Sequence, residues 1–165
     1  MDIDNVESPD DDLRYQGYKK GAARGESMWY ADGEVYFACT NGGAKELGQI
    51  FRYTPSQYEG TPLELEAPSH IELFIESNDQ TLLKNCDNLT IANNGALFIC
   101  GDADDTCKIV GITPEGKLFE FARNAYTDSE PTGACFSLDG KTMFVNIQKN
   151  GMTLAITGPW EKLIS

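Results

Sequence analysis

The feature that most restricts the fold of this chain is a short hairpin pattern that occurs three times. In each copy, two runs rich in β-branched and aromatic residues flank a turn that contains Gly33, Gly95 or Gly140. Such runs favour strands, and an Asp-Gly or Asn-Gly turn is the strongest short-range signal for a tight hairpin. We therefore predict an all-β chain made of repeated hairpins. The predicted hairpin strands are residues 28–30 and 34–39, 89–92 and 96–100, and 134–137 and 142–147.

More strands follow each hairpin, which gives the repeat about four strands. A β-propeller blade is likewise a sheet of about four strands. We therefore expect three blades, with the first strands of the blades side by side at an inner edge. A sandwich is the alternative, but it would not need the same hairpin three times. The additional strands are residues 48–53, 71–76, 108–113, 117–121 and 152–157, which gives blades at about 26–76, 87–122 and 130–160 within residues 26–165, after an acidic loop or linker at 1–25.

Three blades are too few to close a propeller ring, which takes at least about four. We therefore expect the chain to be an incomplete part of a larger protein. An open array of blades exposes strand edges and apolar surface at its two ends. Self-association of the chain is the expected consequence.

The charge of the chain limits its partners. Thirteen basic residues stand against 26 acidic ones, for a net charge of −13. This charge repels phosphate backbones and attracts cations, so nucleic acid is not an expected partner. No apolar run approaches the roughly 18 residues of a membrane helix, and the N-terminus lacks the pattern of a signal peptide. Met1 is thus expected to begin either a cytoplasmic protein or an incomplete copy of a longer one.

The five cysteines follow no metal-ligand spacing. Cys39, Cys100 and Cys135 lie inside apolar runs, where cysteine behaves as a small hydrophobic residue. A disulfide between Cys100 and Cys107 across a hairpin is the alternative.

Four strings of this sequence follow the pattern of one known family: residues 28–37, 87–90, 133–148 and 153–160. They resemble the PhoX family of bacterial alkaline phosphatases. The likeness extends in the family's order from about Leu13 to Trp160 and matches the C-terminal part of a longer protein. It implies about three blades of a six-bladed propeller that hydrolyses phosphate esters with Ca²⁺ and Fe³⁺. It also implies export to the periplasm or cell exterior, a small phosphate ester as substrate, and missing N-terminal blades as a partner.

Candidate metal ligands lie where each innermost strand begins, because in a propeller these positions converge on the central channel. Glu26, Asn88 and Gly133 occupy this place, with Asp87 and Glu130 close by. Carboxylate and amide oxygens suit Ca²⁺, which takes six to eight oxygen ligands. The resemblance places a metal-binding glutamate at Glu26. The alternatives are a surface carboxylate at Glu26, a turn residue at Asn88 and a solvated loop acid at Glu130.

One position departs from the family pattern. After the second strand of the middle blade, the family usually has Cys-Glu-Asp with a metal-binding glutamate, whereas this chain reads Cys100-Gly101-Asp102. Either Asp102, Asp104 or Asp105 substitutes as the ligand, or the ligand is missing. A solvated hairpin tip is the other interpretation of this acidic run. The family's ligating cysteine belongs to an upstream part that this chain does not contain.

The resemblance thus implies a C-terminal fragment of a metal-dependent phosphomonoesterase that is inactive on its own. The sequence assigns no catalytic nucleophile. The alternative is a non-catalytic propeller fragment that binds calcium or a partner, and the missing blades and Gly101 favour it.

Overall fold

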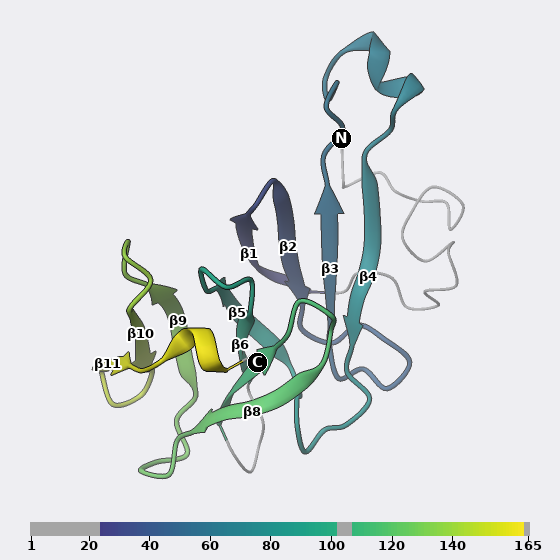
Figure 1. Ribbon diagram of the computed structural model, residues 1–165. Helices are drawn as coiled ribbons and strands as arrows, with labels where there is room; N and C mark the ends of the chain where they lie inside the picture. Colours follow the sequence, from purple (N-terminus) through teal and green to yellow (C-terminus); the bar gives the residue numbers. More distant parts are fainter. Residues whose placement is uncertain (1–23, 102–106, 164–165) are drawn as a thin grey trace.

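The computed structural model describes residues 24–101 and 107–163, which form three antiparallel sheets (Figure 1). The first sheet contains β1 (Gly25–Ala31), β2 (Glu34–Cys39), β3 (Gln49–Thr54) and β4 (His70–Glu76). The second contains β5 (Cys86–Ile91), β6 (Leu97–Gly101), β7 (Lys108–Ile112) and β8 (Leu118–Arg123). The third contains β9 (Pro131–Phe136), β10 (Thr142–Ile147) and β11 (Met152–Thr157). The prediction of an all-β chain is therefore confirmed.

The predicted glycine turns connect the first two strands of each sheet. Asp32 and Gly33 both have positive φ, 51° and 86°, between the paired residues Ala31 and Glu34. Two central residues with positive φ make the tight hairpin turn whose twist matches that of the strands. At Gly140, φ is 68° and an added Cβ would lie 2.2 Å from the side-chain nitrogen of Asn93, so a side chain here would have to displace that of Asn93.

Successive sheets meet along their first strands. Each sheet is a simple meander, and β5 lies against β1 on one side and β9 on the other (Figure 1). This is the arrangement of consecutive propeller blades, as the repeated hairpins predict. The third sheet has three strands in the described residues, in the order β11-β10-β9.

Two apolar layers hold the sheets together. The first fills the space between the first and second sheets with residues such as Ile50, Leu89 and Ile99. The second lies between the second and third sheets and includes Phe98 and Trp160, whose rings are 5.9 Å apart. In the sequence, Trp160 lies beyond the last predicted strand, residues 152–157. The structure instead makes it a core residue, 7% exposed, whose indole nitrogen donates to the carbonyl oxygen of Lys141 at 2.8 Å.

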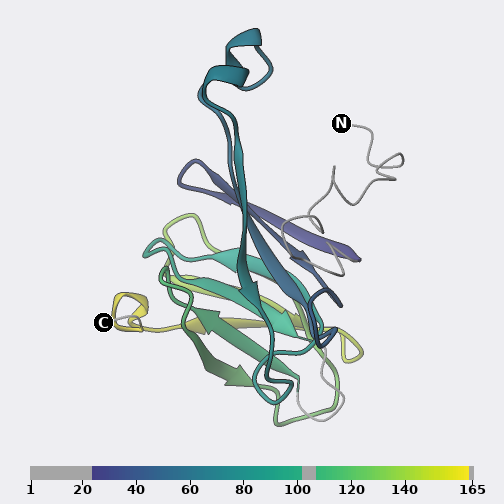
Figure 2. The same ribbon diagram turned by 90° about the vertical axis from the view of Figure 1, so that its right-hand side faces the viewer.

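The helical segments of the described residues are short 3-10 turns, η2 (Pro62–Glu66) and η3 (Trp160–Lys162). None of the helices in this part of the chain is long and apolar enough to cross a membrane. β3 and β4 lead into an arm that carries η2 at its tip, away from the other sheets (Figure 2). Side-chain hydrogen bonds order this arm, including those from Tyr53 to Glu59 at 2.8 Å and from Ser69 to Glu64 at 3.1 Å.

Candidate functional site

All three innermost strands are irregular near the same end. The pairing of β1 with β2 shifts between Gly25 and Met28, and that of β5 with β6 shifts between Cys86 and Leu89. The pairing of β9 with β10 shifts opposite Phe144 and Asn146. Such bulges turn side chains away from the regular alternation and are common next to active sites. The bulged stretches contain the predicted positions Glu26, Asp87, Asn88 and Gly133, which thus lie inside strands rather than in the loops before them.

Asn88 connects the second sheet to the third. Its side-chain oxygen accepts hydrogen bonds from the hydroxyl of Thr132 and from the backbone nitrogen of Gly133. Its side-chain nitrogen donates to Asp87 Oδ1 at 3.2 Å. Because an amide oxygen has two lone pairs, the two donors occupy its acceptor capacity. A metal ion at Asn88 Oδ1 would have to displace at least one of them.

Asp87 and Glu130 lie around the same buried thiol. Burial, together with the nearby charges of Asp87 and Glu130, raises the pKa of Cys100 to about 12. The backbone oxygen of Asp87 also accepts a hydrogen bond from Ser27 Oγ at 2.5 Å, which ties β5 to β1. The structure therefore brings these two predicted acids into one neighbourhood at the inner strands.

Glu26 lies on β1 and faces a cation. Arg24 Nη2 is 3.7 Å from Glu26 Oε1, and the two side chains are 63% and 38% exposed. An ion pair this exposed contributes little to stability, so the carboxylate is held only weakly. Glu26 remains accessible to a competing cation.

The described residues do not by themselves make a metal centre. Within residues 24–101 and 107–163, no three His, Cys, Asp or Glu side chains gather closely enough to hold a metal ion. Asp102, together with Asp104 and Asp105, lies outside these residues. The predicted ligand set of Glu26, Asp87, Asn88, Glu130 and Asp102 therefore stays a prediction, and the described part alone does not fit a calcium or iron centre.

Gly101 lies where the backbone leaves little space for a side chain. It is a buried residue at the end of β6, and an added Cβ would lie 2.9 Å from the backbone oxygen of Lys84 and 3.6 Å from Leu83 Cδ1. A contact under 3.0 Å with backbone requires the chain to move. In this conformation, position 101 has no space for any side chain, let alone a ligating one.

Arg52 and Arg123 form ion pairs on the outer parts of the sheets. Arg52 pairs with Glu72 and lies 3.8 Å from Glu34 Oε2. Arg123 donates to Glu120 at 2.9 Å, and these hydrogen bonds, with one from Lys108, lower the pKa of Glu120 to about 2. Both arginines thus pair with glutamates of their own sheets and do not lie on the inner strands.

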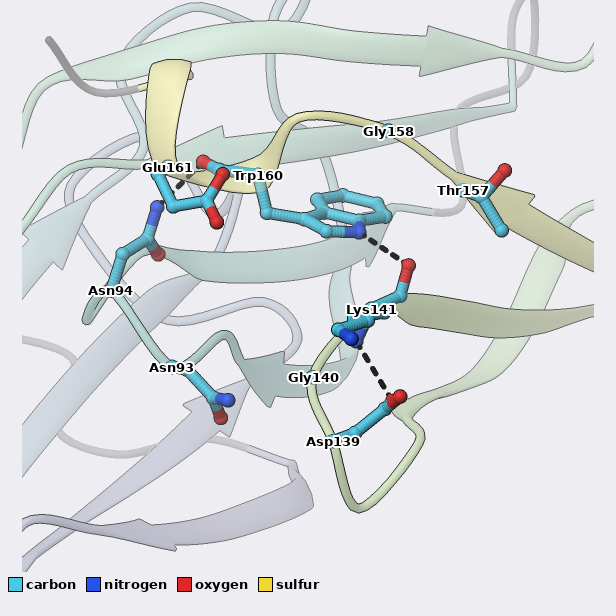
Figure 3. Close-up of a pocket in the computed structure, with 9 residues that line it drawn as sticks. All are labelled: Asn93, Asn94, Asp139, Gly140, Lys141, Thr157, Gly158, Trp160 and Glu161. Carbon is cyan, nitrogen blue, oxygen red and sulfur yellow. Dashed lines mark hydrogen bonds between the residues drawn. The ribbon is translucent and has the colours of Figure 1, made fainter.

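A cleft of about 500 Å³ lies at the other end of the inner strands, and sequence reasoning did not identify it. The turns of the β5–β6 and β9–β10 hairpins and the segment around Trp160 surround it (Figure 3). Asn94 Nδ2 donates to the Trp160 carbonyl oxygen at 2.8 Å, and Lys141 N donates to Asp139 Oδ1 at 3.1 Å. The lining residues are Asn93, Asn94, Asp139, Gly140, Lys141, Thr157, Gly158, Trp160 and Glu161.

Comparison with known proteins identifies one family. A family model described as "Alkaline phosphatase PhoX" matches residues 7–151. No curated protein matches the chain. A crystal structure of selenomethionine-substituted virginiamycin B lyase from Staphylococcus aureus aligns at 16% identity with a TM-score of 0.46. The alignment covers 84% of this chain and 42% of that one, so the chain spans less than half the length of the matched structure.

Proposed function

The chain belongs to the PhoX family of alkaline phosphatases, and from this premise we propose that it contributes three blades to an enzyme that hydrolyses phosphate monoesters. The observation that carries the proposal is the family match over residues 7–151, which includes every strand from β1 to β10. The substrate class is a small phosphate ester. No described residue is assigned as the nucleophile.

The inner strands are the proposed location of the chemistry. Acidic groups lie on or beside the bulged strands at Glu26, Asp87 and Glu130. The charges of Asp87 and Glu130 both raise the pKa of the Cys100 thiol. Acidic oxygen ligands of this kind suit calcium. Since the described residues do not complete a metal centre, the proposal requires Asp102 or protein outside the described residues to supply the remaining ligands.

Hydrolysis of p-nitrophenyl phosphate, with and without added Ca²⁺ and Fe³⁺, tests this proposal. We expect little turnover from the chain alone and metal-dependent turnover from a protein that extends the reading frame upstream of Met1. Asp87→Asn should abolish that turnover, whereas Glu66→Gln on the exposed arm should leave it unchanged. Absence of hydrolysis in both the chain and the extended protein, with folding verified by circular dichroism, would overturn the proposal.

A second candidate function is a non-catalytic propeller fragment that binds calcium or a partner. Gly101 favours it, because the family's glutamate is absent and the backbone oxygen of Lys84 fills the space. Calorimetric calcium binding by the extended protein, without phosphate release, distinguishes this function from the enzyme.

The expected location and partner follow from the same family assignment. We propose that the full-length protein acts in the periplasm or outside the cell, with the remaining N-terminal blades as the partner of this chain. Fractionation of cells that express the extended reading frame tests the location. Retention in the cytoplasm would contradict it.

A further inference from the structure

The outer edge of the third sheet ends at an exposed strand. In the described residues the first two sheets have four strands and the third has three, so β11 is its edge strand. Thr153, Leu154 and Ala155 are exposed, and Leu154 retains 41% of its accessible surface. An edge strand presents a row of backbone N–H and C=O groups to which another strand can be added.

The three outer edges of the array differ in their protection. The edge strand β4 carries His70, Glu72 and Glu76, and the edge strand β8 carries Glu120 and Arg123. Charged side chains on an edge discourage the addition of another strand. β11 has no ionisable residue and no proline over its six residues, in a chain with a net charge of −13. Among the three outer edges of the described residues, β11 is therefore the one that lacks this protection.

The sequence of β11 is complementary to itself. Met152, Leu154 and Ile156 alternate with Thr153, Ala155 and Thr157, so one side is apolar and the other is small and polar. In an antiparallel pair, residues directly opposite each other share a side of the sheet. With Leu154 opposite its own copy, Met152 meets Ile156 and Thr153 meets Ala155, and the apolar side continues across the junction.

We propose that β11 pairs antiparallel with β11 of a second copy of this chain, about a two-fold axis at Leu154. The junction is isologous, so each copy contributes the same surface and the assembly closes as a dimer. It joins two three-stranded sheets into one sheet of six strands. The pairing also brings the exposed Leu154 side chains of the two copies into contact.

The size and charge of this junction set its strength. Six residues bury less area than the roughly 1,200–2,000 Å² of stable interfaces, so the dimer is weak and exchanges with the monomer. The two copies repel each other through their net charges of −13, while the contacting strands are uncharged. Because salt screens long-range repulsion, higher ionic strength should strengthen the dimer.

Analytical ultracentrifugation of the full chain from about 10 μM to about 1 mM tests the proposal. We expect a monomer–dimer equilibrium that shifts towards the dimer with added salt. Leu154→Lys places two like charges opposite each other and should weaken dimerisation at least about tenfold. The matched control is Leu65→Lys on the arm, where the leucine is 91% exposed, and it should dimerise like the parent.

A cross-linking variant keeps the test decisive if the lysine variant folds poorly. The L154C variant should form a covalent dimer on oxidation, and mass spectrometry should identify a peptide joined through position 154 in both copies. An L65C variant should not form this link. A chain that stays monomeric at every concentration, a dimer that Leu154→Lys does not weaken, or a cross-link formed only at other positions would overturn the proposal.

Discussion

The side-chain oxygen of Asn88 accepts a hydrogen bond from the backbone nitrogen of Gly133, and this contact joins the innermost strands of the second and third sheets. A second donor, the hydroxyl of Thr132, reaches the same oxygen. Both donors lie near the bulge in β9, where the regular ladder with β10 is interrupted. Asn88 thus supplies an acceptor at the place where backbone pairing fails.

Replacement of Asn88 by alanine should lower the free energy of unfolding by about 1–3 kcal/mol, because Thr132 and Gly133 lose their acceptor. Urea denaturation measures the change. Asn146→Ala is the matched control, since that side chain accepts a hydrogen bond from the exposed Thr153. Asn88→Asp preserves an acceptor oxygen and should lie between alanine and the parent. Equal stability of the Asn88→Ala and Asn146→Ala variants would show that Asn88 does not join the sheets.

Gly101→Ala should destabilise the chain by about 1–3 kcal/mol, since the new Cβ would lie 2.9 Å from the Lys84 carbonyl oxygen. Gly158→Ala is the control, because nothing lies within 4 Å of a Cβ at that position. Thermal unfolding of both variants checks the difference. If Gly101→Glu were as stable as the parent, the inferred lack of space would be wrong.

The strands and turns could be predicted from the sequence because their signals are local. Alternating and β-branched runs define β2, β10 and β11 almost to the residue. The glycines at 33 and 140 have the positive φ that their turns require. The order of the sheets followed from recognising one hairpin three times, since repeats stack on their neighbours.

The site was less predictable because it depends on which atoms meet across sheets. The sequence offers Asn88 as an oxygen ligand or a turn residue, and nothing in it shows that Thr132 and Gly133 occupy that oxygen. The close approach of Lys84 to Gly101 involves backbone, which a residue pattern does not encode. For the same reason Trp160 was not recognised as a core residue, since its partners come from three distant strands.

Trp160 should be among the most sensitive residues to substitution. Its ring contacts Phe98, Phe121 and Phe136 at centroid distances of 5.9, 5.5 and 4.9 Å, from strands of two sheets. Trp160→Ala should cost about 3–5 kcal/mol of stability. Trp160→Phe retains much of the packing but loses the hydrogen bond to Lys141, for a loss of about 1 kcal/mol from that bond.

The control for these tryptophan variants is Tyr126→Ala, because Tyr126 is 76% exposed. Its effect should stay within about 0.5 kcal/mol. Chemical denaturation followed by circular dichroism measures all three variants. If Trp160→Ala lost no more stability than Tyr126→Ala, the packing of Trp160 in the second apolar layer would not contribute to the stability of the fold.

Cys86 should make the fold sensitive to high pH. Burial raises its pKa from 9.0 to about 12, so the neutral thiol is favoured in the folded state. The corresponding stability is present below about pH 9 and is lost as the pH rises towards about 12, up to on the order of 4 kcal/mol. Between these values Cys86→Ala should lose stability less steeply than the parent. Denaturation curves at stepwise pH check this slope, with Cys135→Ala as the half-buried control; parallel slopes in parent and Cys86→Ala would contradict it.

The choice of a control for Glu26 depends on the neighbours of the other glutamates. Glu34 lies on β2 and accepts hydrogen bonds from Tyr36 at 2.9 Å and Thr54 at 3.1 Å, so its replacement would disturb the first sheet. Glu66 is exposed at the end of η2 on the arm, away from the inner strands. Glu66→Gln therefore removes one negative charge without altering the inner strands.

Calcium should raise the melting temperature of the full chain if Glu26 and the other predicted ligands converge. Clustered carboxylates repel one another, and a cation that binds them in the folded state shifts the unfolding equilibrium by mass action. At a calcium concentration about 100 times the dissociation constant, the gain is about 2.7 kcal/mol. Glu26→Gln should weaken calcium affinity about tenfold or more, and Glu66→Gln should leave it nearly unchanged. Titration calorimetry that gave equal affinities for the two variants would remove Glu26 from the site, and calcium binding would then have to arise from other acids of the chain.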